Sequence, residues 1–171
     1  ANIFSYPDYG VKTSDENPSE TRLPGFPELK ELPGTKAEAD SIKRIMSTQS
    51  WYIEEFLRKE ATEDAIKKVN NPQVLHIATH AVAGDSSNQP FLVLKNKFYL
   101  GQLQYSIAAS PLVVLTACET AAGQLQTGEG VVSLGRAFIS KGVKGVVASR
   151  WKVDDAVAPV FVKAFYDELN K

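Results

Sequence analysis

The feature that most constrains this fold is a set of three short, almost wholly apolar runs, at Gln73–Ala78, Leu112–Thr116 and Gly145–Ser149. Their length and β-branched residues indicate buried strands rather than helices. Strands that are covered on both faces are typical of parallel sheets. Because helical patterns separate these runs, the sequence predicts β-α-β units with right-handed crossovers, and hence an α/β fold with one mainly parallel sheet.

Capping and turn residues place the remaining elements. Thr35, with Glu38 three residues later, has the pattern of a capping box for a helix that reaches Met46. Gly142 is expected to end a helix over Glu129–Lys141. We also expect a strand at Ile3–Tyr6, a helix from Thr62 that stops before Asn71, a helix at Gly101–Ala108 and a last helix from about Asp155 to Leu169. Phe91–Leu94 and Lys97–Leu100 are expected to form a small hairpin or two short extended pieces, and Trp51 and Tyr52 to occupy core positions.

Composition limits the class of protein. The 171 residues suit one domain over 1–171, in which the Pro-, Gly-, Ser- and Glu-rich stretch 1–34 forms a loop-rich segment. A net charge of −1 does not favour nucleic-acid binding, and no apolar run approaches the ~20 residues of a membrane span. The single cysteine cannot form an internal disulfide, which indicates a reducing, cytoplasmic setting. Since the chain does not begin with Met, we expect it to be a piece of a longer polypeptide.

Two reactive side chains follow the strongest strand patterns. His80 comes directly after the first run and Cys118 directly after the second, and ligands bind at the carboxyl ends of parallel strands. A nearby imidazole can take the thiol proton and later protonate a leaving amine. The amides of Cys118 and Ala81 are candidate donors to an oxyanion. Topology alone leaves open that His80 caps a turn and that Cys118 is a core residue, and it favours His76 as a hydrogen-bonded core or supporting histidine.

The motifs around these residues extend along nearly the whole chain. Leu75–Ala81 is similar to the segment LHIATHG, and Val114–Thr120 to VLSACETG, of one known family. Ser133–Phe138, Ser149–Asp155 and Leu32–Glu38 are similar to three further segments of that family, in the same order. On these motifs the chain resembles the CHAT domain family, relatives of caspases and separase that are found mostly in bacteria.

This resemblance implies a caspase-like three-layer sandwich and a cysteine endopeptidase that cleaves peptides or proteins through an acyl-enzyme. Cys118 would be the nucleophile and His80 the general base and acid. The sequence contains no cluster of metal ligands and implies no cofactor, but it leaves open a dependence on calcium, as in some caspase-like relatives. In the family the domain usually ends a larger protein whose earlier part carries tetratricopeptide repeats. We therefore expect the chain to be the C-terminal part of such a protein, regulated by the repeat region or by an activating partner.

The sequence departs from the family pattern at two positions. Ala81 replaces a glycine, which would cost about 1 kcal/mol if the backbone there had a positive φ, and Arg150 replaces a leucine before the tryptophan. Separase-like relatives imply that Asp155, with Asp154 nearby, selects Arg or Lys before the scissile bond; the alternative is that both cap a helix. Glu119 is expected to support the nucleophile loop by accepting hydrogen bonds.

Two other functions remain open from the sequence. The first is a catalytically silent caspase-like module for protein interaction or signalling, which would keep His80 and Cys118 without using them. The second is a cysteine hydrolase that acts on small amides.

Overall fold

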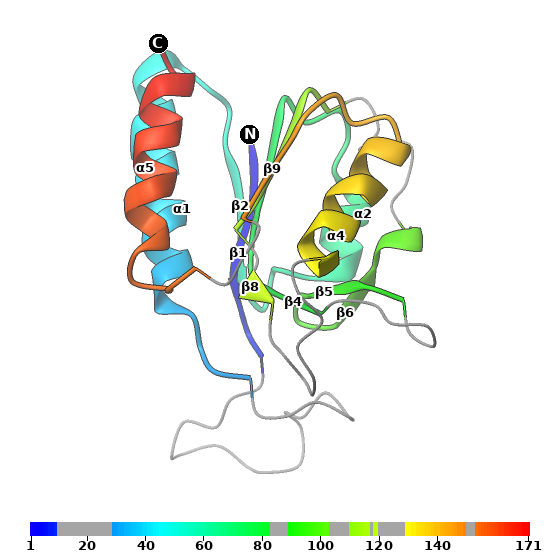
Figure 1. Ribbon diagram of the computed structural model, residues 1–171. Coiled ribbons are helices and arrows are strands. Elements are labelled where there is room, and N and C mark those ends of the chain that lie inside the picture. Colours follow the sequence, from blue (N-terminus) through cyan, green and yellow to red (C-terminus); the bar gives the residue numbers. More distant parts are fainter. Residues whose placement is uncertain (10–28, 83–88, 103–109, 117, 120–128, 150–152) are drawn as a thin grey trace.

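Five parallel strands form the central sheet, with helices on both sides (Figure 1). The computed structural model describes residues 1–9, 29–82, 89–102, 110–116, 118–119, 129–149 and 153–171. The strand order β2-β1-β3-β7-β9 puts the two most apolar predicted strands side by side. The bounds are β1 (Asn2–Pro7), β2 (Glu54–Arg58), β3 (Val74–Ala78), β7 (Leu112–Leu115) and β9 (Val146–Ala148).

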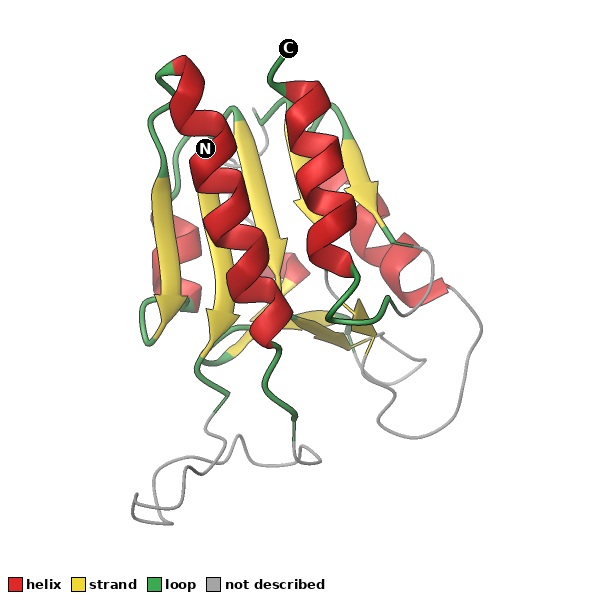
Figure 2. Ribbon diagram, turned by 90° about the vertical axis from the view of Figure 1, so that its left-hand side faces the viewer, coloured by secondary structure: helices red, strands yellow, loops and turns green. Residues whose placement is uncertain are grey.

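In the described part of the chain, four helices form the two outer layers. On one side α1 (Pro33–Met46) packs along α5 (Ala158–Leu169), and both lie in front of the sheet in Figure 2. On the other side lie α2 (Glu63–Lys68) and α4 (Glu129–Ser140). The predicted caspase-like three-layer α/β sandwich with a mainly parallel sheet is confirmed. In the part of the chain that the structure describes, no helix has the length and apolar content needed to cross a bilayer.

A second, smaller sheet lies at the carboxyl ends of the parallel strands (Figures 1 and 2). Its order is β6-β5-β4-β8, and only the β4–β8 pair is parallel. The predicted hairpin is confirmed as β5 and β6, but the single predicted sheet is incomplete because these short strands form a sheet of their own. The bounds are β4 (His80–Val82), β5 (Phe91–Val93), β6 (Lys97–Tyr99) and β8 (Cys118–Glu119), with single 3₁₀ turns η1 (Ser47–Gln49) and η2 (Leu100–Gln102).

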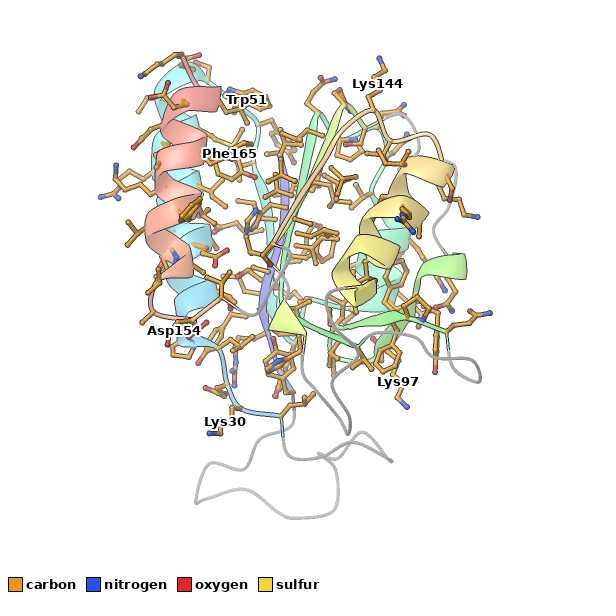
Figure 3. All side chains as sticks on the ribbon, viewed as in Figure 1. Lys30, Trp51, Lys97, Lys144, Asp154 and Phe165 are labelled. Atoms are coloured by element: carbon orange, nitrogen blue, oxygen red, sulfur yellow. The ribbon has the colours of Figure 1, made fainter. Side chains whose placement is uncertain are left out.

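Each face of the main sheet has its own core. On the face toward α2 and α4 the apolar cluster includes Phe4, Ile66, Leu75, Ile77, Leu134 and Phe138. The face toward α1 and α5 packs Ile3, Ile42, Met46, Val74, Val114, Val162 and Tyr166 among others. Figure 3 shows Phe165 of α5 directed toward this second core.

The local predictions for the helices hold with two corrections. Thr62 does cap α2, where its side chain accepts from the Ala65 amide, and Gly142 has a positive φ after α4. The capping box of α1 is wrong, because α1 begins at Pro33 and Glu38 is turned into the core. The last helix begins at Ala158 because its preceding residues form a turn whose amides donate to the Asp154 carbonyl.

The segment before α2 contains a strand that the sequence did not indicate. β2 is an edge strand whose ends are charged, and of its side chains Phe56 stacks on Phe4 with ring centroids 4.4 Å apart. Trp51 is half-buried against the core, as expected, whereas the core position predicted for Tyr52 is wrong because it is 76% exposed. The helix predicted at Gly101–Ala108 falls mostly outside the described residues.

Candidate active site

The small sheet joins the two strand ends that carry the candidate dyad. β4 continues from β3 after Thr79, and β8 follows β7. Residues His80 and Cys118 are direct partners in the parallel β4–β8 register, and Ala81 partners Glu119. Because neighbouring strands lie about 4.8 Å apart, the backbones of the two candidate catalytic residues are adjacent. The side chains of Cys118 and Glu119 lie outside the described part of the structure.

A backbone carbonyl fixes the orientation of the His80 ring. The ring is 4% exposed, and its Nε2 lies 2.7 Å from the carbonyl oxygen of Lys30, in the segment that leads to α1. A carbonyl oxygen can only accept, so Nε2 carries the proton. In the neutral ring Nδ1 is then the nitrogen that can take a proton, as a general base requires. Figure 3 places Lys30 below the carboxyl ends of the sheet.

Tyr9 packs over the same imidazole. The two ring centroids are 4.8 Å apart, and Tyr9 is 6% exposed. The Thr79 hydroxyl donates to the Val93 carbonyl, and the Tyr9 hydroxyl lies 3.0 Å from the Thr79 Oγ1. Since the Thr79 proton is already used, Tyr9 donates to Thr79. The Tyr9 ring is therefore held above His80 by a hydrogen bond to Thr79, which itself bonds to β5 of the second sheet.

The segment that presents the Lys30 carbonyl is itself anchored through Glu31. Tyr6 Oη donates to the Glu31 carboxylate at 2.6 Å, and Arg58 Nη1 lies 2.7 Å from its other oxygen. The Arg58 guanidinium also lies over the Tyr6 ring, 4.8 Å from its centroid. The hydrogen bond from Tyr6, and then that from Arg58, lower the pKa of Glu31, so that the anchor stays charged at neutral pH.

Ala81 occupies a regular strand rather than a strained turn. Among described residues outside glycine, positive φ occurs only at Tyr6, Ser50, Arg58 and Asn71, so the alanine carries no left-handed strain. Its side chain is 1% exposed and packs in the apolar core. Ala81 partners Leu92 on one side and Glu119 on the other. Its amide therefore faces a neighbouring strand. To stabilise an oxyanion as well, this amide would have to donate to both the oxyanion and the neighbouring strand.

The two aspartates predicted to select a basic residue have hydrogen-bond partners in the fold. Asp155 Oδ2 accepts from the Gly34 amide at 2.7 Å, so Asp155 caps α1, a helix distant in sequence. Asp154 Oδ1 accepts from the Ala156 amide at 2.8 Å, in the turn before α5 where Figure 3 labels it. The helix-capping interpretation is thus realised for Asp155, although on α1 rather than on α5. Their role in substrate selection stays a prediction.

His76 is a fully buried, hydrogen-bonded histidine of β3. Its Nε2 lies 3.2 Å from Glu38 Oε2, and its Nδ1 lies 3.2 Å from the Tyr166 hydroxyl. The ring points to the α1–α5 side, where Tyr166 meets it edge-on. This is the core or supporting role that the sequence favoured. Arg150, the other departure from the expected pattern, lies outside the described residues.

Several residues of this region were not found from the sequence. Lys30 acts through its backbone and Glu31 through partners far along the chain, so no local pattern could mark them. Tyr9 had a weak signal as an aromatic residue just beyond the first strand. Glu38 had a misleading signal, because it fits a capping box.

Two comparisons with known proteins give a match. The family model described as CHAT domain matches residues 12–171. A relative from Mus musculus, tetratricopeptide repeat protein 28, is 41% identical over 58 residues, which is 34% of this chain and 2% of that protein. The chain thus corresponds to a very small part of that relative. No solved structure matches the chain significantly.

Proposed function

The chain belongs to the CHAT domain family, and on that premise we propose that it is a cysteine endopeptidase with Cys118 as nucleophile and His80 as general base and acid. The observation that carries the proposal is the backbone register that pairs His80 with Cys118 at the carboxyl ends of two parallel strands. The Lys30 carbonyl supports it further, since it leaves Nδ1 as the basic nitrogen of the ring.

The proposed reaction is an acyl transfer in two halves. The Cys118 thiol gives its proton to His80 Nδ1, and the sulfur attacks the carbonyl carbon of the scissile peptide bond. The C–N bond then breaks as Nδ1–H protonates the leaving amine, which leaves a thioester on Cys118. Water attacks the thioester while His80 takes one of its protons, and the proton returns to the sulfur as the acid product leaves.

The oxyanion of each tetrahedral intermediate needs hydrogen-bond donors. We propose the amides of Cys118 and Ala81 for this role, with the Ala81 amide shared between the oxyanion and the sheet. Glu119 is proposed to support the loop that carries the nucleophile. A peptide or protein is the proposed substrate.

Regulation is a second part of the proposal. The short likeness to a tetratricopeptide repeat protein supports association of this domain with such repeats, in the same polypeptide or in a partner. We propose that the repeats control access to the dyad or its alignment. A free thiol as nucleophile also supports a reducing compartment such as the cytoplasm.

The single cysteine makes a direct test possible. A peptidyl acyloxymethyl ketone alkylates a catalytic thiolate with loss of its carboxylate, and intact-mass spectrometry then reports one site. We expect labelling of the protein with its repeat partner, no labelling of Cys118→Ala, and a rate lower by about 10²–10⁴-fold in His80→Ala, the contribution of a general base. Ser47→Ala, at an exposed position of η1, is the matched control and should label like the wild type.

The alternatives give different results in the same experiment. Equal labelling of the wild type and His80→Ala, with the repeat partner present, would contradict the peptidase and favour the silent interaction module. Turnover of small amides in preference to peptides would favour the small-amide hydrolase.

A further inference from the structure

A network of buried polar side chains lies between the main sheet and the α1–α5 layer. Glu38 of α1, His76 of β3 and Tyr166 of α5 are all 0% exposed. Ionisable side chains are seldom fully buried, because their removal from water costs free energy even when they are paired. Replacement of such a network by apolar residues is often neutral or stabilising, so stability alone does not explain it.

The hydrogen bonds of this network converge on one oxygen atom. Glu38 Oε2 accepts from the Thr116 hydroxyl at 2.6 Å and lies 3.2 Å from His76 Nε2. A carboxylate oxygen only accepts, so the contact with Glu38 places a proton on His76 Nε2, and the Tyr166 hydroxyl lies 3.2 Å from His76 Nδ1 on the other side of the ring. Burial raises the pKa of Tyr166, which keeps its hydroxyl proton in place for this bond.

The two donors to Glu38 belong to the two strands that lead to the proposed dyad. Thr116 follows β7 and precedes Cys118 by two residues, and His76 lies in β3, four residues before His80. The Thr116 amide also donates to the Ile77 carbonyl at 3.1 Å, so the strands are joined at this level by their backbones as well. Glu38 thus links the middle of β3 to the carboxyl end of β7 through one carboxylate.

The helix that carries Glu38 is held at its first turn. The Gly34 amide donates to Asp155, the Ser5 hydroxyl donates to the Thr35 carbonyl, and the Tyr6 amide donates to Thr35 Oγ1 at 3.2 Å. These contacts fix α1 against β1 and against the turn before α5. Glu38 is therefore presented from a fixed helix, as a residue that sets the position of other groups needs to be.

We infer that Glu38 is a positioning residue that, through Thr116 and His76, sets the ends of β7 and β3 and so the alignment of Cys118 with His80. The inference rests on the proposed function. It assigns a role to a side chain that touches neither dyad residue nor substrate. The effect is on the reactivity of the dyad, because a displacement of about 1 Å in a reacting pair can lower a rate by 10²-fold.

The sharpest test removes one hydrogen-bond donor without changing side-chain shape. In Thr116→Val the link from Glu38 to β7 is lost, and we expect the rate of Cys118 labelling by the peptidyl acyloxymethyl ketone to fall roughly 10–100-fold. The pH profile of Cys118 alkylation by iodoacetamide should move toward that of an ordinary thiol, near about 8.5. Thr116→Ser, which keeps the hydroxyl, should restore both. Glu38→Met, which removes the acceptor, should reproduce the loss.

Ser110→Ala is the matched control for loss of a buried hydroxyl. Ser110 lies before the amino end of the same strand, is 0% exposed, and donates to the Leu112 carbonyl at 3.0 Å. Its variant should keep wild-type reactivity and pH profile, with melting temperatures measured for all variants. Wild-type reactivity in folded Thr116→Val, or failure of Thr116→Ser to restore it, would overturn the inference and leave the peptidase standing. If Cys118 were labelled at the wild-type rate in His80→Ala, both the inference about Glu38 and the proposed peptidase would be overturned.

Discussion

The two faces of the central sheet are built from different kinds of residue. Toward α2 and α4 the buried side chains of β3 and β7 that the structure describes are the apolar Leu75, Ile77, Val113 and Leu115. Toward α1 and α5 the apolar cluster surrounds buried polar groups, among them Glu38, His76 and Thr35. Dispersion and burial are non-directional, whereas hydrogen bonds specify distance and angle. The first face is suited to hold the sheet together, and the second to fix where particular strands end.

The polar face is also the face that reaches the candidate site. Glu38 bonds to Thr116, two residues before Cys118, and to His76, four residues before His80. The segment before α1 supplies the carbonyl that orients His80. Among the described residues of the apolar cluster, Ala81 is the one that follows His80 directly in β4. Variants on the two faces should therefore differ in kind: those on the apolar face should change stability, and those on the polar face should change alignment as well.

The largest expected effect on stability is on the apolar face. Phe138 of α4 is 0% exposed, and Phe138→Ala should lower the free energy of unfolding by about 3–5 kcal/mol. Ile139 is the next residue and 48% exposed, so Ile139→Ala should cost about 1 kcal/mol or less. Urea unfolding followed by tryptophan fluorescence measures both. Under conditions where Phe138→Ala is folded, the pH profile of Cys118 alkylation should match the wild type; a shifted profile would contradict the division between the faces.

The sequence predicted best where neighbouring residues determine the structure. The apolar runs of β3 and β7, and the Thr62 cap of α2, depend on side chains within a few positions of each other. The strand ends also predicted that His80 and Cys118 would be neighbours, because the carboxyl ends of adjacent parallel strands meet.

The sequence failed where a residue satisfies a local pattern but bonds to a distant partner. Glu38 fits a capping box, yet it bonds to Thr116, which is 78 residues away. Asp155 fits a helix N-terminus close by, yet it caps α1 across 121 residues. The edge strand β2 was missed because its two apolar residues stand between charged ones and form no alternating pattern. Its position follows from pairing with β1. Such choices depend on tertiary contacts that periodicity does not contain.

Two glycines offer an intermediate test, one on each side of the sheet. A Cβ at Gly34 of α1 would lie 1.8 Å from the Asp155 carbonyl oxygen, a backbone atom that cannot turn away. Gly34→Ala should therefore cost about 1–3 kcal/mol of stability, and it should slow Cys118 labelling because α1 must shift. At Gly135 of α4 the nearest atom, Val146 Cγ1, is at an ordinary 3.6 Å. Gly135→Ala should stabilise by roughly 0.5–1 kcal/mol through helix propensity and leave labelling unchanged.

If Gly34→Ala and Gly135→Ala changed the rate of Cys118 labelling equally, the proposed difference between the polar and the apolar face would be contradicted. A stabilising Gly34→Ala would show that the close approach of α1 to the turn before α5 is not maintained in solution.

The smallest expected effect concerns Asp155, for which capping and substrate selection make separable predictions. Asp155→Ala removes the acceptor for the Gly34 amide and should cost about 1 kcal/mol. Asp155→Asn keeps an acceptor oxygen but not the charge, so its stability should stay within a few tenths of a kcal/mol of the wild type. If Asp155 also attracts a basic side chain, both variants should lose preference for Arg or Lys in a peptide library.

A loss of stability in Asp155→Ala alone, with unchanged cleavage preference in both variants, would assign Asp155 to the polar face as a structural cap only. A loss of preference in Asp155→Asn at wild-type stability would give it both roles, since the carboxylate could then hold α1 with one oxygen while its charge acts on the substrate. In the second case the polar face would contribute to substrate recognition as well as to the alignment of the dyad. Asp155 would then both hold the helix that carries Glu38 and bind the residue before the scissile bond.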